Sequence, residues 1–185
     1  MSSTYSKYFE VHTAKHFKES FAEANVYLTY GYVMPWTNES NPPQANTSPD
    51  SEYETWKYMI GGKRITSSDI RHVVPRFDWA SNTVYTAYDN LTDFRTLPAN
   101  TAFYVITDEF NVYKCIANNY GKSSTYKPTS TNPTSTFQTA DQYIWKYMYT
   151  LTGEEQLRFL TKDYMPVKTV TIDDSSLQWQ VQQDA

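Results

Sequence analysis

The stretch HVVPRFDWASNTVY, residues 72–85, places an arginine and an aspartate two positions apart and follows them with a tryptophan. A guanidinium and a carboxylate at this spacing can serve as catalyst and counter-ion, or as a structural ion pair. The residue types at Arg76, Asp78 and Trp79 leave both interpretations open. The rest of the sequence has to decide between them.

A metal site is the next chemistry to consider, because His12 and His16 lie four residues apart. On a helix both imidazoles would share a face and could occupy two positions on a zinc ion. However, Thr13 stands where the H-E-x-x-H motif has its glutamate, and His72 is distant in the sequence. We favour two histidines on a solvated helix face, and we expect no metal or cofactor.

Neither a nucleophile nor a catalytic acid pair is favoured by its sequence context. Cys115 lies between Lys114 and Ile116 in a predicted strand, which is typical of a small packing residue. The adjacent acids 108–109 and 173–174 would point to opposite faces of a strand, so a turn, a solvated patch or a partner's arginine explains them better than glycoside hydrolysis. Phosphate-binding glycine motifs are missing from the sequence, and we expect no enzyme.

Composition limits the partners. The 185 residues carry a net charge of -4 with a pI near 5.3, and no run of Lys or Arg is long enough to follow a phosphate backbone. No window approaches the roughly 18 to 20 apolar residues that span a bilayer. Hydrophobic residues make up 39% of the chain, and this share includes 17 tyrosines, whose rings suit interfaces. We therefore expect protein partners, and neither nucleic acid nor membrane.

Periodicity predicts short helices, short strands and long loops. The apolar spacing and a capping-box pattern at Ser51 and Glu54 indicate a helix that is stopped by Gly61 and Gly62. A second capping-box pattern precedes another helix. In chain order we predict a helix at 13–24 with Phe17 and Phe21 docked inward, a strand at 26–31, a helix at 51–60, one or two helical turns at 63–75, strands at 83–88 and 102–107, a hairpin turning at 108–111, an exposed loop at 121–141, a strand at 142–151 and a helix from 152 to about 163.

The strand at 142–151 carries the strongest local pattern, because four rings alternate with other residues and so share one face: Tyr143, Trp145, Tyr147 and Tyr149. Two interpretations remain open. The rings can form core and subunit interface, or they can stack on sugars as an adhesion module that binds host glycans.

These elements together predict an α+β fold dominated by strands, with an antiparallel β-sheet or sandwich, a few short helices and long loops. We expect one domain over residues 1–167. The remaining residues, 168–185, are interpreted as a C-terminal extension that could act as an interaction arm.

The order of motifs resembles a known family. YLTYGYVMPW is followed by PDSEYETWKYMIGGKRITSSDIRHVVPRFDW, then by FYVITDEFNVYKCIANNYGKSSTYKPT and TADQYIWKYMYTL. This order, over residues 26–167, resembles the baseplate wedge subunit of T-even-type contractile-tailed bacteriophages, the gene-product-eight family, in a shortened form. Gln142 departs from the pattern, because glycine commonly stands at that position.

The resemblance implies a non-enzymatic structural protein of the virion, located in the tail baseplate and assembled in the host cytoplasm. It implies contacts with other wedge proteins of the same virion, a homodimer within the wedge, and movement when the tail contracts.

With that expectation, the structural interpretation of residues 76–79 becomes our hypothesis. Arg76 and Asp78 fix a corner through charge-assisted hydrogen bonds, and the rings of Trp79 and Trp36 are buried nearby. The structural and interface candidates from the sequence are Pro35, Trp36, Trp56, Arg76, Asp78, Trp79, Tyr143, Trp145, Tyr147 and Tyr149.

Overall fold

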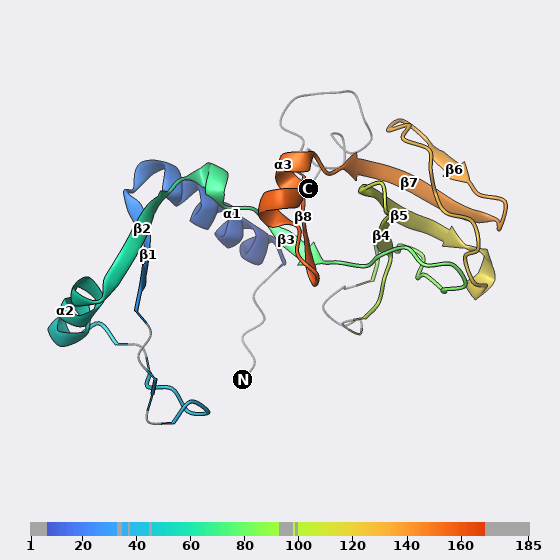
Figure 1. Cartoon of the computed structure of the whole chain (residues 1–185). Coiled ribbons are helices and arrows are strands. Elements are labelled where there is room, and N and C mark those ends of the chain that lie inside the picture. The colour runs from blue at the N-terminus through green and yellow to red at the C-terminus, as the bar shows by residue number, and fades with distance from the viewer. Residues whose placement is uncertain are drawn as a thin grey trace. The chain divides into compact units, whose positions relative to one another are not determined.

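The structure is a computed structural model of the whole chain, and it describes residues 7–32, 35–36, 38–44, 46–92, 98 and 100–168. The chain divides into two compact units, residues 1–71 and residues 72–185. Each unit is described by itself (Figure 1). Within the described ranges, no helix combines the length and the apolar character that crossing a bilayer demands. The predicted boundary between residues 167 and 168 stays a prediction, since residues 169–185 lie outside the described part.

The first unit is a two-stranded ribbon with helices at its ends. Strands β1 and β2 pair antiparallel, and the short helix η1 that follows β2 lies against α1. In Figure 1 α2 lies at the other end of the ribbon. The elements are α1 (Lys7–Glu23), β1 (Val26–Gly31), α2 (Pro49–Lys57), β2 (Met59–Ile65) and η1 (Ser67–Asp69).

Helix α1 and strand β1 confirm two predictions, although α1 begins before the predicted start. The inward docking of Phe17 is wrong, because 60% of this residue is exposed. Its ring instead contacts that of Phe21 edge to face, with the centroids 5.0 Å apart.

The predicted helix 51–60 is wrong at both ends. The helix N-cap is Ser48, whose side chain accepts a hydrogen bond from the amide of Ser51, and Pro49 supplies the fixed φ that suits a first turn. The helix ends at Lys57 because β2 pairs with β1. Gly61 is therefore a strand residue, and it leaves room for the ring of Tyr30 across the ribbon.

The helical turns predicted at 63–75 are mostly wrong as well. Only η1 is helical there, and its capping box joins Thr66 to Asp69. A hydrogen bond from Lys63 is the main cause of the lowered pKa of Asp69, and bonds from Thr66 add to it. The residues on either side belong to β2 and β3 instead, because strand pairing satisfies their backbone groups.

The second unit is built on a four-stranded antiparallel sheet in the order β4-β5-β7-β6, beside a separate antiparallel pair of β3 and β8. Helix α3 contacts β8. The elements are β3 (Val73–Pro75), β4 (Tyr104–Ile106), β5 (Asn111–Asn118), η3 (Asn119–Gly121), β6 (Thr136–Gln138), β7 (Tyr143–Thr150), α3 (Gly153–Phe159) and β8 (Tyr164–Pro166). The strand-dominated α+β class is confirmed, as are the hairpin that turns at 108–111 and the strand that follows the long loop.

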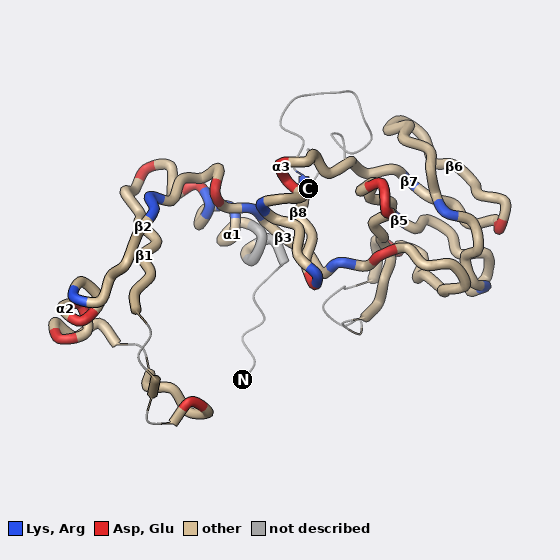
Figure 2. Tube along the Cα trace, in the orientation of Figure 1, with Lys and Arg blue, Asp and Glu red and all other residues tan. Residues whose placement is uncertain are grey.

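The core of the second unit consists of two clusters. The first packs aromatic rings around Trp145, and its buried members are Tyr85, Val105, Tyr113, Cys115, Tyr143 and Trp145. The second is smaller and contains Ile106, Val112, Leu151 and Met165. Lys and Arg are interspersed with Asp and Glu along the traced chain (Figure 2), and the apolar burial in these two clusters is the main driving force of the fold.

The strand predicted at 83–88 is wrong, apart from one isolated bridge between Thr83 and Ser124. Its backbone amides are satisfied by different segments instead of one partner strand. Thr86 donates to Ala102, and Tyr88 donates to Cys115. The segment is therefore an extended connection whose backbone bonds to several segments.

The exposed loop predicted at 121–141 is wrong in part, because it contains β6 and the buried residue Ser124. The carboxylate of Asp141 explains this order. One of its oxygens accepts hydrogen bonds from the Ser124 hydroxyl at 3.0 Å, the Thr125 amide at 2.7 Å and the Tyr126 amide at 3.0 Å. A single charged side chain thus holds the start of the loop to its end.

Candidate functional site

Arg76 joins two parts of the second unit. Its Nε and Nη2 donate to Asp78 Oδ1 at 3.0 and 2.8 Å, and its Nη1 donates to the carbonyl of Thr161 at 3.1 Å. Its backbone amide also donates to the backbone carbonyl of Asp163 at 2.9 Å. The guanidinium therefore ties the end of β3 to the segment between α3 and β8. The side chains of Arg76 and Asp78 are 24% and 60% exposed, so the ion pair itself contributes under about 1 kcal/mol.

Trp79 lies across the sheet edge at β4. Its backbone amide donates to the carbonyl of Ile106 at 2.9 Å, and its indole Nε1 donates to the Ser124 hydroxyl at 3.3 Å. The ring packs against the first core cluster. Trp79 is thus half-buried and held at both its backbone and its ring.

The expectation that the ring of Trp36 is buried is wrong, while its nearness to Trp79 stays a prediction. Trp36 belongs to the other compact unit and is 47% exposed. Its amide donates to the carboxylate of Glu39, which closes a local turn. Pro35, beside it, is also exposed.

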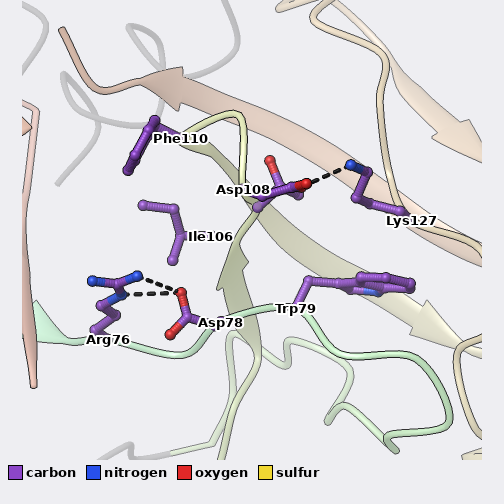
Figure 3. Close-up of a pocket in the computed structure, with 8 residues that line it drawn as sticks. Arg76, Asp78, Trp79, Ile106, Asp108, Phe110 and Lys127 are labelled. Carbon is purple, nitrogen blue, oxygen red and sulfur yellow. Dashed lines mark hydrogen bonds and ion pairs between the residues drawn. The ribbon is translucent and has the colours of Figure 1, made fainter. Parts of the chain in front are cut away.

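A hollow of about 610 Å³ opens beside Trp79. It brings together residues from three segments: Arg76, Asp78, Trp79, Ile106, Thr107, Asp108, Phe110 and Lys127. Figure 3 shows two ion pairs at this site, Arg76 with Asp78 and Lys127 with Asp108, with the indole of Trp79 close by. The sequence predicted the 76–79 part of this site but not the contribution of the β4–β5 turn or of Lys127.

Lys127 anchors the acidic turn of the β4–β5 hairpin. Its Nζ lies 2.7 Å from Asp108 Oδ1 and also contacts the carboxylate of Glu109. The hydrogen bond with Lys127 is the main cause of the lowered pKa of Asp108, and its counterpart raises the pKa of Lys127. The adjacent acids therefore form the predicted turn, and the lowered pKa keeps Asp108 ionised at neutral pH.

The four rings of β7 do not form one open face. Tyr143 and Trp145 are fully buried in the first core cluster, and Tyr147 packs against it. Tyr149 packs instead against the second cluster, and its hydroxyl donates to the carbonyl of Pro166. A bulge at Met148 shifts the register between these two rings. Burial argues against the glycan-binding interpretation of this face at Tyr143 and Trp145, because a sugar cannot reach rings that are fully buried.

The first unit presents the opposite situation, because none of its side chains within the described part is buried. Trp56 on α2 is 71% exposed, and Tyr53, three residues earlier on the same helix face, is 68% exposed. We call the exposed large apolar residues of the ribbon and α2 the ribbon apolar set: Tyr27, Leu28, Tyr30, Tyr53, Trp56, Tyr58 and Ile60. Of this set, only Trp56 is among the interface candidates from the sequence.

The remaining candidates for chemistry from the sequence are a histidine pair, a cysteine and an acid pair. The rings of His12 and His16 lie side by side on α1 with centroids 4.3 Å apart, and no group of three or more metal-ligating side chains occurs among the described residues. Cys115 is buried, which raises the pKa of its thiol to about 12 and keeps it protonated at neutral pH. The acid pair 173–174 lies outside the described residues.

Comparison with known proteins gives the family. Residues 6–122 match the family model described as "Bacteriophage T4, Gp8". The chain is also 24% identical over 178 residues to "Baseplate wedge protein gp8" of Enterobacteria phage T4, and this similarity covers 77% of the chain and 52% of the T4 protein. The chain thus spans about half the length of that relative. Since the family model covers well over half of the 185 residues, the resemblance noted from the motifs is confirmed, and the protein belongs to the Gp8 family of bacteriophage T4.

Proposed function

We propose that the protein is a structural, non-enzymatic component of a contractile-tail baseplate wedge, located in the tail of the virion. Membership of the Gp8 family is the observation that carries this proposal, together with the name of the T4 relative. The buried, protonated thiol of Cys115 is in keeping with a protein that does no covalent chemistry.

The work of such a subunit is to link its neighbours, and the ribbon apolar set supports this part of the proposal. A two-stranded ribbon is marginally stable alone in water. Here its tyrosines, such as Tyr27 and Tyr30, are more than 60% exposed. Exposed Tyr and Trp side chains are the residue types that dominate binding energy at protein interfaces. We therefore assign the first unit the main contact with neighbouring wedge proteins.

A second copy of the chain is one of the neighbours we propose, so that the protein forms a homodimer within the wedge. The same ribbon apolar set would be shared by both copies if the two are related by a two-fold axis, since such an interface uses one patch twice. Sedimentation of the purified chain alone tests this part of the proposal.

We also propose that these contacts rearrange when the tail contracts. A rearrangement of this kind requires contacts whose free energies differ between two baseplate states. The division into two compact units, each with its own sheet, supports this, because each unit can hold a different neighbour.

The test is co-sedimentation of the full chain with the structural proteins encoded beside its gene. We expect a stoichiometric complex, and we expect Trp56→Ala to weaken it at least tenfold, as loss of an interface tryptophan does. Leu157→Ala is the matched control, since this apolar residue is 90% exposed but lies on α3 in the second unit. A chain that ignores every neighbour, or a complex that both variants weaken equally, would contradict the proposal.

A further inference from the structure

In the hollow beside Trp79, the basic side chains are less exposed to solvent than the acidic side chains that pair with them. The side chains of Arg76 and Lys127 are 24% and 29% exposed. The acids that pair with them are far more open, with Asp78 at 60%, Asp108 at 76% and Glu109 at 50%. The cations therefore lie toward the protein while the carboxylates face solvent, and a ligand approaching the hollow meets the acids first.

Asp78 keeps acceptor capacity at this site. Both hydrogen bonds from Arg76 end on its Oδ1, so Oδ2 accepts none from the described residues. An ionised carboxylate can accept from two oxygens, and a guanidinium is the donor that matches this geometry best. The unused oxygen is therefore available to a second cation.

Trp79 supplies an aromatic wall that is already held in position. Its indole Nε1 donates to Ser124, and the Ser124 hydroxyl in turn donates to Asp141 at 3.0 Å. A cation over an indole face is attracted by the ring, and a planar guanidinium can also stack on it. A fixed ring loses little side-chain entropy when a ligand binds.

From these observations we infer that the hollow between Trp79 and the β4–β5 turn receives a basic side chain, an arginine, from a neighbouring protein of the assembly. This inference rests on the proposed function, since it names the chemistry of a partner at one site. The charge of residues 72–185 also favours a basic partner, because this part of the chain contains nine Lys or Arg and twelve Asp or Glu. The stretches 1–6 and 169–185 contain no Lys or Arg, so these two stretches cannot supply the occupant.

The experiment follows the indole N–H resonance of Trp79 in the full, isotopically labelled chain while Nα-acetyl-arginine amide is added. The neutral isostere Nα-acetyl-citrulline amide is the matched probe. We expect a saturable shift with the arginine probe, at least fivefold weaker binding of the citrulline probe, and weakening of the arginine effect by salt. Equal shifts with both probes, or no shift with arginine, would overturn the inference.

Two variants on the solvated turn locate the effect, since their side chains are exposed and their loss leaves the core intact. We expect Asp108→Asn and Glu109→Gln each to weaken arginine binding severalfold. Glu154→Gln on α3 is the control, because this acid is 74% exposed and lies outside the hollow. If Glu154→Gln weakened arginine binding as much, the net charge of the chain would explain the binding. That result would contradict the proposed site.

Arg95 is the only basic residue outside the described ranges, and Arg95→Gln tests it as the occupant. If the arginine probe bound this variant but not the wild-type chain, Arg95 itself would be the occupant of the hollow. That result would contradict the inference of a partner's arginine. The chain could form a complex with its neighbours and yet show no response to the arginine probe. That outcome would reject this inference but not the proposed function.

Discussion

The carboxylate of Asp141 accepts a hydrogen bond from the hydroxyl of Ser124 at 3.0 Å, across 17 residues of chain. Through that hydroxyl it also positions the indole of Trp79. Burial alone would raise the pKa of Asp141, but hydrogen bonds from Thr139, from the amides 125 and 126 and from Ser124 together lower it. The ionised form is therefore the one that the fold prefers.

Asp141→Asn should accordingly destabilise the protein by about 1–3 kcal/mol at neutral pH, the range for hydrogen bonds to a charged group. A folded-state pKa below the ordinary value of 3.8 means that the contribution is fully present above pH 4 and is lost as the pH falls through the folded value. The difference between the wild-type and variant free energies of unfolding should therefore shrink in acid. Urea unfolding at several pH values measures it.

Asp89→Asn is the control for this prediction. The pKa of Asp89 is also lowered, chiefly by a hydrogen bond from Thr92, but its bonds close only a local exposed turn. We expect a smaller loss of stability there. If both variants lost the same free energy of unfolding, the hydrogen bonds of Asp141 would contribute no more than those of a local surface turn.

Gly31→Ala should destabilise the ribbon of the first unit. A Cβ at this position would lie 2.9 Å from the carbonyl oxygen of Tyr58, which is backbone and cannot rotate away. The same carbonyl accepts the amide of Tyr32, so moving it would break a further bond. We expect a cost of about 1–3 kcal/mol, as for other overpacked sites. Hydrogen exchange of the β1 and β2 amides reports it locally.

Gly153→Ala is the matched control, because a Cβ there has no heavy atom within 4 Å and the residue opens helix α3. Alanine is a better helix former than glycine, so this change should be neutral or slightly stabilising. Faster exchange in the ribbon with Gly153→Ala, or unchanged exchange with Gly31→Ala, would be contrary to the steric explanation.

The corner at residues 76–79 should respond unequally to its two charged partners. Arg76→Ala removes the bond to Thr161 and the packing of a mostly covered side chain, so we expect a loss of about 1–2 kcal/mol. Asp78→Ala removes a mostly exposed partner and should cost under about 1 kcal/mol. Thermal unfolding of both variants measures the difference, and equal losses would mean that the ion pair, rather than the bond to Thr161, holds the corner.

The sequence predicted those elements whose own side chains carry a period or a turn signal. Strand β7 has strict aromatic alternation, and the β4–β5 hairpin has two apolar runs around an acidic turn, so both were found. Strand β2 was not, because Gly61 and Gly62 look like a stop signal until Tyr30 is known to need the space. Residues 83–88 have strand composition, but their backbone partners come from separate segments.

Only part of the candidate site could be predicted, because only some of its residues are neighbours in the sequence. Arg76, Asp78 and Trp79 are neighbours in the sequence, so their cluster is visible there. Lys127 lies in the loop whose residues 125 and 126 donate to Asp141, and no local sequence pattern indicates that this loop reaches the site. The exposure of Trp56 was equally hidden, since an apolar period looks the same whether it faces a core or a partner.

Two turns of the second unit share one geometry and give a final prediction. In the β6–β7 turn the amide of Gln142 donates to Thr139, and in the β4–β5 turn the amide of Phe110 donates to Thr107, each at 2.9 Å. Both closing residues are left-handed, with φ of 66° for Gln142 and 61° for Phe110. A non-glycine residue in that conformation costs roughly 1–2 kcal/mol.

Gln142→Gly should therefore raise the free energy of unfolding by about 0.5 kcal/mol, once the greater freedom of glycine in the unfolded chain is subtracted. Phe110→Gly relieves the same backbone strain but removes a ring that packs against the second core cluster, so it should lower stability by about 2 kcal/mol or more. Thermal and urea unfolding of the two variants separate the effect of backbone strain from the effect of losing the packed ring. If both changes destabilised the protein equally, the backbone conformation would not be the source of the cost at Gln142.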